Sequence, residues 1–314
     1  MSGPDVAVEI QGLTKSYGPL KAVDGLSLSV RKGEVFGFLG PNGAGKTTTL
    51  KMLAGLTKPD AGSIRIMGNE MHFGGQAGKA RIGYLPDVPE CYGYMNAAEF
   101  LALNARLCGM TPDAARKRID ELIRMVGMTG VKKRIGSFSR GMKQRIGIAQ
   151  ALIDEPDVVL MDEPVSALDP EGRFEVIEIL RQIRGRTTVF FSTHILSDIE
   201  RVCDSAAIIR SGRILEHGTV TELKQRYDRH KISVVLPSDI EREAADGFQA
   251  LLLRNPWVSD VERTTPNRFR ITVRDRRDAQ AGLPRLLSEA GLPLESMDSV
   301  SVSLEDVFLE VIRR

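Results

Sequence analysis

The sequence has few of the residues that hold together disulfide-rich or zinc-dependent domains. It contains three cysteines, Cys91, Cys108 and Cys203, an odd number without any C-x-x-C spacing. This usage argues against a disulfide framework and against a structural zinc site, and it is typical of a protein kept in a reducing cytosol.

Long apolar runs and a targeting segment are also missing. No apolar run approaches the roughly 18 residues of a membrane-spanning helix, and the best stretches are short, such as Val158–Met161. The first residues, MSGPDVAVEI, have neither the basic nor the apolar region of a signal peptide. We therefore expect no transmembrane segment, so another chain must cross the bilayer if the protein serves a membrane process.

The chain lacks an excess of charge of either sign. Its 43 Lys and Arg residues against 41 Asp and Glu give a net charge of +2. Because no global field would attract nucleic acid, no nucleic-acid partner is expected. The apolar share of 42% over 314 residues is that of an ordinary globular protein with two domains.

Residues 40–48, GPNGAGKTT, form the pattern around which the chain is organised. They follow an apolar run at 34–39 and precede a stretch of helical composition at 51–54. A glycine-rich turn between a strand and a helix aims peptide N–H groups and the helix dipole at a polyphosphate. We expect this loop to bind nucleotide through Gly40, Pro41, Asn42, Gly43, Ala44, Gly45, Lys46, Thr47 and Thr48. Lys46 supplies charge to the outer phosphates, and the Thr47 hydroxyl is placed to ligate Mg²⁺.

Two adjacent carboxylates follow the apolar strand at 158–161. Ligands gather at the carboxyl ends of parallel strands, so Asp162 is expected to hold Mg²⁺ opposite Thr47. Glu163 is expected to orient or deprotonate a water molecule near the γ-phosphate. Together with the phosphate loop, this pair predicts phosphoryl-transfer chemistry.

The pattern of apolar residues predicts two domains. Alternating strands at 6–10, 26–30 and 63–68 and apolar strands at 158–161 and 187–191 indicate an α/β domain whose mixed sheet has a parallel centre. Helical periods over about 96–153 predict an inserted helical subdomain. A restart after residue 228 in the order βαββαβ predicts an α+β, ferredoxin-like domain over 229–314.

Five ordered motifs resemble those of the ATP-binding subunits of ATP-binding cassette (ABC) transporters. They are GPNGAGKTT at 40–48, FSRGMKQR at 138–145, VVLMDEP at 158–164, SALD at 166–169 and STH at 192–194. The resemblance covers about residues 6–225. It implies that residues 1–228 form a P-loop ATPase cassette that hydrolyses ATP, with Mg²⁺, to power a separate permease at the cytoplasmic face of the membrane.

The family pairs two cassettes head to tail around two ATP molecules. The resemblance therefore implies that the signature segment of one cassette caps the γ-phosphate held by Lys46 of the other. That segment consists here of Ser139, Arg140, Gly141 and Met142. The second cassette completes either a homodimer or a heterodimer.

Four further roles rest on the same resemblance. His194 would contact the γ-phosphate, and Asp169 would link the two sites across the dimer. Tyr17 occupies the position of the ring that stacks on adenine. The segment with Tyr92 and Tyr94 is the one that meets the permease, although simple exposure would also explain two loop tyrosines.

The sequence departs from the family pattern at two places. Arg140 and Met142 replace the usual glycine and glutamine of the signature, while the serine and glycine that face phosphate are kept. Asp87 stands where the family has a glutamine that ligates Mg²⁺. Aspartate is shorter, so it would ligate Mg²⁺ directly or through water, and Glu90 is an alternative ligand.

The C-terminal part resembles the domain appended to cassettes of the multidrug, type-2 exporter branch. Its ending, SVSLEDVFLEV at 301–311, carries this likeness and points to an exporter. One alternative is a soluble cassette ATPase that acts on ribosomes or DNA, which a single uninterrupted cassette disfavours. Another is a regulatory cassette without turnover, which the presence of both Glu163 and His194 disfavours.

Overall fold

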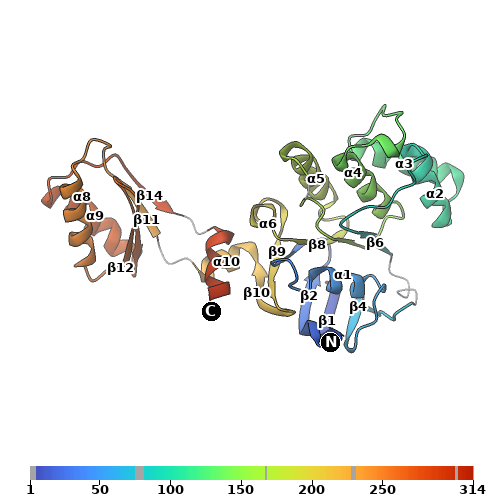
Figure 1. Cartoon of the computed structure of the whole chain (residues 1–314), viewed down its shortest axis with the longest axis horizontal. Helices are drawn as coiled ribbons and strands as arrows, with labels where there is room; N and C mark the ends of the chain where they lie inside the picture. Colours follow the sequence, from blue (N-terminus) through green and yellow to red (C-terminus); the bar gives the residue numbers. More distant parts are fainter. Residues whose placement is uncertain (1–4, 75–80, 167, 228–230, 301–302, 314) are drawn as a thin grey trace. The chain divides into compact units, whose positions relative to one another are not determined.

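Two units make up the chain in this computed structural model, which describes residues 5–74, 81–166, 168–227, 231–300 and 303–313 (Figure 1). Unit 1 comprises Met1–Val220 with Val311–Arg314, and unit 2 comprises Thr221–Glu310. The boundary predicted between residues 228 and 229 lies outside the described residues. Within the described ranges, no helix is both long enough and apolar enough to cross a membrane.

The centre of unit 1 is a mixed sheet of six described strands. Their order is β10 (Arg213–Thr219), β9 (Ser205–Arg210), β3 (Val35–Leu39), β8 (Thr188–Thr193), β7 (Val158–Met161) and β6 (Ile82–Leu85). All neighbours are parallel except β10 and β9. Every residue of β3, β7 and β8 is buried, as expected for strands covered on both faces. The predicted mixed sheet with a parallel centre is confirmed.

The early strands form a second, antiparallel sheet. Its order is β2 (Leu20–Arg31), β1 (Val6–Tyr17), β4 (Ala61–Ile66) and β5 (Asn69–Glu70). The sequence analysis placed these strands next to the phosphate loop but did not separate them from the central sheet. Their alternation explains the separation, because strands with one polar face cannot lie at the centre of a sheet covered by helices on both sides.

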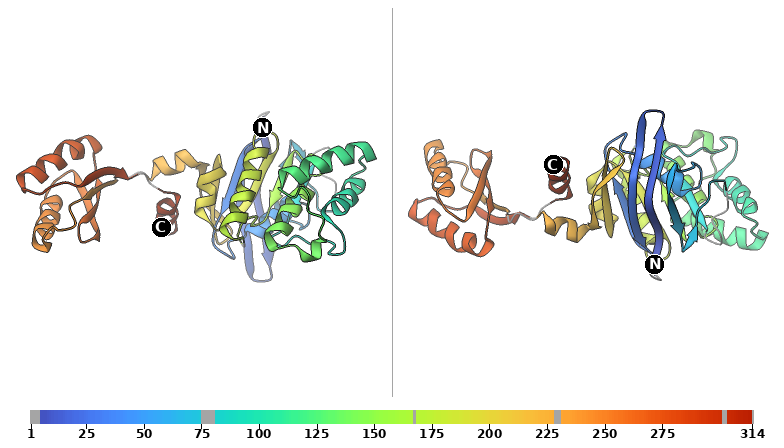
Figure 2. Two further views of the ribbon diagram at one scale, coloured as in Figure 1. Left: turned by 90° about the horizontal axis from the view of Figure 1, so that it is seen from above. Right: turned by 90° about the horizontal axis from the view of Figure 1, so that it is seen from below.

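Helix α1 (Lys46–Leu53) lies between the two sheets. Its Leu50 and Leu53 are buried in one cluster with Phe36 and Phe190 of the central strands. Helices α5 (Pro170–Ile183) and α6 (Leu196–Val202) cover the opposite face of the central sheet (Figure 1). Seen from above and below, helices lie over one face and the long antiparallel strands over the other (Figure 2).

The helical region of unit 1 contains α2 (Ala97–Leu107), α3 (Pro112–Met125), the short η1 (Ile135–Ser137) and α4 (Arg140–Ala151). Asn96 and Glu99 form a capping box at the start of α2, and Thr111 caps α3, which has Pro112 in its first turn. All three cysteines are free thiols, and Cys108 is exposed where α2 ends.

Unit 2 contains a four-stranded antiparallel sheet and its helices. The sheet order is β12 (Val258–Thr265), β13 (Arg268–Val273), β11 (Lys231–Val235) and β14 (Ser296–Val300). The remaining helices are α7 (Val220–Arg226), α8 (Arg242–Leu253), α9 (Arg276–Glu289) and α10 (Leu304–Arg313). The chain order β11-α8-β12-β13-α9-β14 gives the predicted βαββαβ arrangement.

One predicted strand of unit 2 was misplaced. The sequence placed the last strand at Val300–Val302, of which 301 and 302 lie outside the described residues, whereas β14 spans Ser296–Val300 and pairs with β11. The stretch carries polar side chains at most positions, so it lacked the apolar signal of a strand.

Candidate functional site

The glycine-rich loop runs from the end of β3 into α1. Gly45 occupies the position before α1 with φ 105°, a conformation that L residues rarely adopt. A Cβ atom added to Gly45 would lie 2.3 Å from the Ala22 carbonyl oxygen of β2. The loop therefore packs against β2 in a way that only glycine allows, with the N–H groups that begin α1 unpaired within the helix.

A cavity of about 470 Å³ opens beside this loop. It is lined by Tyr17, Leu20, Ala22, Asn42, Gly43, Gly45, Lys46, Thr47, Thr48, Asp87 and Glu163. The structure thus brings the loop, the aromatic ring at the end of β1 and two carboxylates to one pocket. Gly40, Pro41 and Ala44 belong to the same loop, although they are not among its lining residues.

Lys46 is the buried cation of the pocket. Its side chain is 5% exposed, and Nζ donates to the carbonyl oxygens of Gly40 at 2.7 Å and Pro41 at 3.2 Å. The same Nζ lies 3.1 Å from Oε1 of Glu163. The ammonium is therefore held between the loop backbone and a carboxylate, and Lys46 is one of the residues that line the cavity.

Asp162 and Glu163 follow β7, next to the end of β8. Asp162 is buried and accepts a hydrogen bond of 2.6 Å from the Ser192 hydroxyl. The same Ser192 oxygen accepts from the Glu163 N–H at 3.0 Å. Ser192 therefore bridges the two carboxylate residues from the neighbouring strand.

Glu163 collects several partners around one carboxylate. Its Oε2 lies 3.0 Å from His194 Nδ1 and accepts a hydrogen bond from the Ser166 hydroxyl. Burial would raise the pKa of Glu163, but the Ser166 hydrogen bond and the charges of Lys46 and His194 outweigh it and lower that pKa. Glu163 therefore stays ionised and available to accept a proton.

Asp87, which follows β6, faces an acidic environment. Burial raises its pKa, the Asp162 and Glu163 carboxylates raise it further, and only the Arg140 charge opposes them. A cation bound here would relieve this repulsion. Glu90, the alternative ligand, lines a different pocket.

The predicted Mg²⁺ ligands Thr47, Asp162 and Asp87 offer a hydroxyl and two carboxylates. Such oxygen donors suit Mg²⁺, which takes one or two carboxylates and completes its shell with phosphate oxygens and water. Among the described residues, no three His, Cys, Asp or Glu side chains converge as a complete metal cage. The donor set therefore fits a metal that arrives with a polyphosphate.

The signature residues lie outside this pocket. Ser139 caps α4, and its hydroxyl accepts from the Met142 N–H at 3.2 Å, while Gly141 and Arg140 form the first turn. Asp169 caps α5 and accepts from the Gly172 N–H at 3.0 Å. None of these residues is among those that line the cavity of the same chain.

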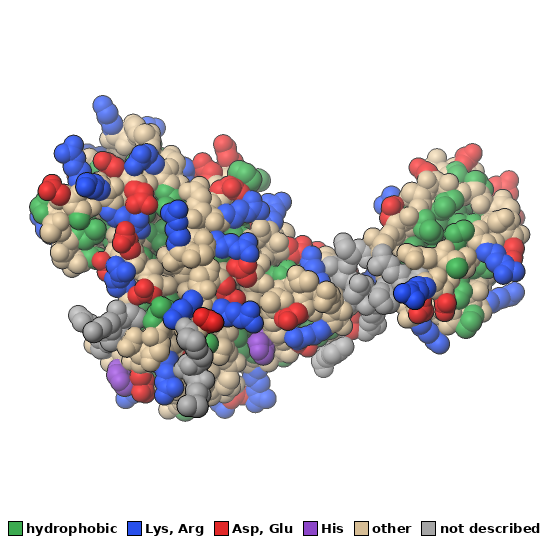
Figure 3. All heavy atoms as spheres, turned by 180° about the vertical axis from the view of Figure 1, so that it is seen from behind, with side chains coloured by type: hydrophobic (Ala, Val, Ile, Leu, Met, Phe, Trp, Pro, Cys, Tyr) green, Lys and Arg blue, Asp and Glu red, His purple; other side chains and the backbone are tan. Residues whose placement is uncertain are grey.

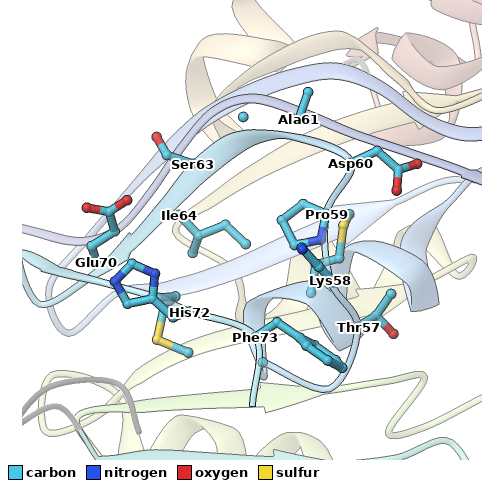
Figure 4. A pocket seen from close by; sticks show the side chains of 14 residues that line it. Thr57, Lys58, Pro59, Asp60, Ala61, Ser63, Ile64, Glu70, His72 and Phe73 are labelled. Atoms are coloured by element: carbon cyan, nitrogen blue, oxygen red, sulfur yellow. The ribbon is translucent and has the colours of Figure 1, made fainter. Parts of the chain in front are cut away.

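Two of the further pockets in unit 1 differ from this one in the residues that line them. One, of about 250 Å³, lies beyond the end of α1 and is lined by residues that include Lys58, Asp60, Glu70, His72 and Phe73 (Figure 4). It mixes opposite charges and lacks a phosphate-binding loop. The other, of about 660 Å³, lies on the helical region.

An aromatic surface borders the pocket on the helical region. Tyr92, which lines it, and Tyr94 are 52% and 63% exposed, and their ring centroids lie 5.8 Å apart. Tyr92 also lies edge-on to Phe100 of α2, with centroids 6.4 Å apart. Two neighbouring, exposed tyrosines of this kind are common at contact surfaces.

Sequence reasoning missed two hydroxyl groups of the site. Ser192 and Ser166 lie within the motifs STH and SALD, which were recognised as wholes without a role for either serine. Their position beside two carboxylates in these motifs was the available signal. The contacts of Ser192 depend on the adjacency of β7 and β8, which the sequence does not state, whereas Ser166 contacts Glu163 three residues before it in the chain.

Two family descriptions match the chain. The one described as "ABC transporter" matches residues 23–166. The one described as "ATP-binding protein DrrA1-3-like, C-terminal domain" matches residues 218–312. The two matches together reach both units.

Two curated relatives are similar over nearly their whole length. The bacitracin transport ATP-binding protein BcrA of Bacillus licheniformis is 36% identical, over 97% of each chain. The daunorubicin resistance ATP-binding protein DrrA3 of Streptomyces coeruleorubidus is 36% identical, over 98% of this chain and 96% of its own. A solved structure described as an ATP-binding subunit of an ABC transporter has a TM-score of 0.64 and 30% identity, over 70% of this chain and 93% of its own.

Proposed function

The chain belongs to the ATP-binding proteins of ABC transporters, in the exporter type of these two relatives, and from this premise we propose how its residues divide the work. It is the subunit that binds and hydrolyses ATP for transport, as the sequence predicted. The observation that carries the proposal is the convergence of Tyr17, Lys46, Asp87 and Glu163 on one cavity beside the phosphate loop.

The cavity would take ATP with its base at one end and its phosphates at the other. The unpaired N–H groups at the start of α1, with those of residues 40–45, would hold the phosphates. Lys46 would turn from Glu163 toward the outer phosphates. Tyr17, which is 50% exposed at the pocket, would stack on adenine.

Thr47 and Asp162 would hold Mg²⁺, with Asp87 as a third ligand, directly or through water. Bound there, the metal would neutralise charge on the phosphate oxygens. Asp162 is already oriented by Ser192, which fixes one of its oxygens. The acidic environment of Asp87 makes it a suitable partner for a cation.

Glu163 would position the attacking water molecule and accept its proton. Its lowered pKa keeps it ionised, and the contacts with Ser166 and His194 hold the carboxylate in place. The His194 ring is 44% exposed, so it can face the γ-phosphate while it contacts Glu163. Lys46 and His194 would stabilise the charge that develops on the phosphoryl group.

A second cassette would complete the reaction centre. Ser139, with the N–H groups of Arg140 and Gly141, starts α4 and so forms an anion site that does not line its own chain's cavity. Facing the cavity of a second cassette, it would cap the γ-phosphate. Asp169 would lie at the contact between the two cassettes.

The permease would dock on the aromatic surface of the helical region. Tyr92 lines a cavity of about 660 Å³ there, and the ring of Tyr94 lies beside that of Tyr92, so a short helix of the permease would place its side chains against these rings. On the face shown in Figure 3, Lys and Arg alternate with Asp and Glu over unit 1, which offers no basic tract for a nucleic acid.

The test uses Mg²⁺-dependent hydrolysis together with oligomeric state. The Glu163→Gln variant should bind ATP, hydrolyse it at least about a hundredfold more slowly and elute as a dimer when ATP is present. The wild-type protein should hydrolyse ATP, so its dimer should be short-lived and the protein should elute mainly as a monomer. Equal hydrolysis by both proteins would remove Glu163 from the mechanism, and full activity of a strict monomer would exclude the shared site.

A further inference from the structure

On the edge that faces β4, the end of β1 is held by a side chain instead of by a strand, while β2 stays paired with its other edge as far as Tyr17. The pairing of β1 with β4 stops at Thr14 and Ala61. Beyond this point, the Ser16 N–H donates to Oδ2 of Asp60 at 2.7 Å, and the Asp60 N–H donates to the Thr14 carbonyl oxygen at 2.9 Å. Asp60 thus replaces the missing strand where β1 approaches the nucleotide pocket.

The same carboxylate holds Lys15. Nζ of Lys15 lies 2.8 Å from Oδ1 of Asp60, and the lysine side chain is 16% exposed. This ammonium also lies 5.6 Å from the centroid of the Tyr17 ring. A cation at that distance is attracted by the aromatic ring, so the ring of Tyr17 has a partner that is itself fixed by Asp60.

Asp60 also belongs to the segment that follows the phosphate loop. It lies between α1, which begins with Lys46, and β4. In Figure 4, Asp60 lies at one end of the pocket, and its carboxylate points away from His72 and Glu70. Asp60 therefore connects α1, which begins at the phosphate loop, with the end of β1, where Tyr17 is proposed to stack on adenine.

We propose that Asp60 and Lys15 are positioning residues for the base of the nucleotide. Asp60 fixes the end of β1 and the Lys15 ammonium, and Lys15 holds the Tyr17 ring in the orientation that stacks on adenine. This inference rests on the role of Tyr17 in the proposed function. Neither residue lines the nucleotide cavity, so both act through Tyr17.

The energetic reason is preorganisation. Tyr17 is 50% exposed, so its ring must otherwise be ordered when the nucleotide binds. A ring already held by Lys15 loses less freedom on stacking. The phosphates gain nothing from this arrangement, so the effect should be confined to ligands that carry a base.

The experiment compares ATP with inorganic tripolyphosphate, both with Mg²⁺, by calorimetry on the full chain. Asp60→Asn and Lys15→Met should each weaken ATP binding about two- to fivefold and leave tripolyphosphate binding unchanged. Glu9→Gln is the matched control. Glu9 lies on β1, the strand that carries Lys15, and its carboxylate lies 3.8 Å from the Arg65 guanidinium. This control variant should bind ATP and tripolyphosphate with unchanged affinity.

A double-mutant cycle with Tyr17→Ala separates this inference from the proposed function. Lys15→Met should have no further effect on ATP binding in the Tyr17→Ala background, because its route runs through the ring. Equal losses for ATP and tripolyphosphate, or an unchanged ATP affinity in both variants, would overturn the inference. If Tyr17→Ala itself leaves ATP binding unchanged, the stacking role fails, and the inference fails with it.

Discussion

The ammonium of Lys46 lies 3.1 Å from the carboxylate of Glu163. The two side chains are 5% and 12% exposed, so water screens this pair little. Lys46 is the residue proposed to hold the outer phosphates, and Glu163 is the proposed base. Nucleotide must therefore compete with Glu163 for Lys46, so Glu163 affects both the affinity for ATP and the rate of hydrolysis.

Removing the charge of Glu163 should therefore have opposite effects on binding and on chemistry. In Glu163→Gln we expect ATP to bind several-fold more tightly, because Lys46 is released, while hydrolysis falls by about 10²–10⁴-fold. Calorimetry measures the affinity for ATP, and phosphate release measures the rate of hydrolysis. Glu178→Gln on α5, a half-exposed carboxylate paired with Arg181, is the control and should change neither. Weaker ATP binding by Glu163→Gln would contradict the competition.

The shared reaction centre predicts complementation between two inactive variants. Lys46→Met should abolish ATP binding, and Ser139→Ala should abolish hydrolysis through its missing γ-phosphate contact. An equal mixture forms some dimers with one intact site, so it should recover about a quarter of wild-type activity. Mixing two batches of Lys46→Met serves as the control and should recover none. Failure of the mixture to hydrolyse ATP, although the two variants elute together as a dimer with ATP, would argue against a site built from two copies of this chain.

The two candidate carboxylates for Mg²⁺ can be separated by parallel substitutions. Asp87 lines the nucleotide cavity, whereas Glu90 lines the pocket on the helical region. Asp87→Ala should raise the Mg²⁺ concentration needed for half-maximal hydrolysis several-fold, since it removes an oxygen ligand of the metal. Glu90→Ala should leave this concentration unchanged, and chelation of Mg²⁺ should stop hydrolysis in all variants. The reverse pattern would assign the ligand to Glu90.

The local patterns of the sequence were enough to locate most of the site. The phosphate loop and the Asp162–Glu163 pair could be predicted because each depends on a few consecutive residues, whereas the role of Tyr17 rested on the family resemblance. The structure adds that the loop, Tyr17 and Glu163 line one cavity. The hydrogen bonds of Ser192 could not be predicted, because they require β7 and β8 to be neighbours with Met161 opposite Phe191.

The fold was predictable where periodicity was strong. Continuous apolar runs identified the central strands β3, β7 and β8, and the βαββαβ order identified the arrangement of unit 2. Helix α6 was missed because it has only seven residues and its buried Asp198 breaks the apolar pattern. That carboxylate is tolerated because Arg173 of α5 donates to it at 2.7 Å, a contact between distant segments.

Glu34, at the start of β3, predicts a pH-dependent term in the free energy of unfolding. Burial raises its pKa above 4.5, with a contribution from Asp204, although the Arg31 N–H and the Ser205 hydroxyl donate to it. The folded state therefore binds this proton more tightly than the unfolded state, so the cost of ionised Glu34 is full at neutral pH and is relieved as the pH falls toward 4.5.

Urea unfolding of wild type and Glu34→Gln at several pH values measures this term. The difference in unfolding free energy should shift in favour of wild type as the pH falls from 7 toward 4.5, because only wild type gains the proton. The variant acts as its own control for all other titrating groups. A difference that is constant, or that shifts in favour of the variant, would contradict the raised pKa.

Two glycines of the phosphate loop allow strain and steric overlap to be separated. Gly43 has φ 80° with no atom within 4 Å of an added Cβ, whereas Gly45 has φ 105° and places that Cβ 2.3 Å from the Ala22 carbonyl oxygen. Gly43→Ala should cost only backbone strain, about 1–2 kcal/mol of unfolding free energy, and weaken ATP binding modestly. Gly45→Ala should cost more stability and abolish ATP binding, because the loop must move off β2. Denaturation and calorimetry on both variants measure this, and equal losses would show that strain alone decides the shape of the loop.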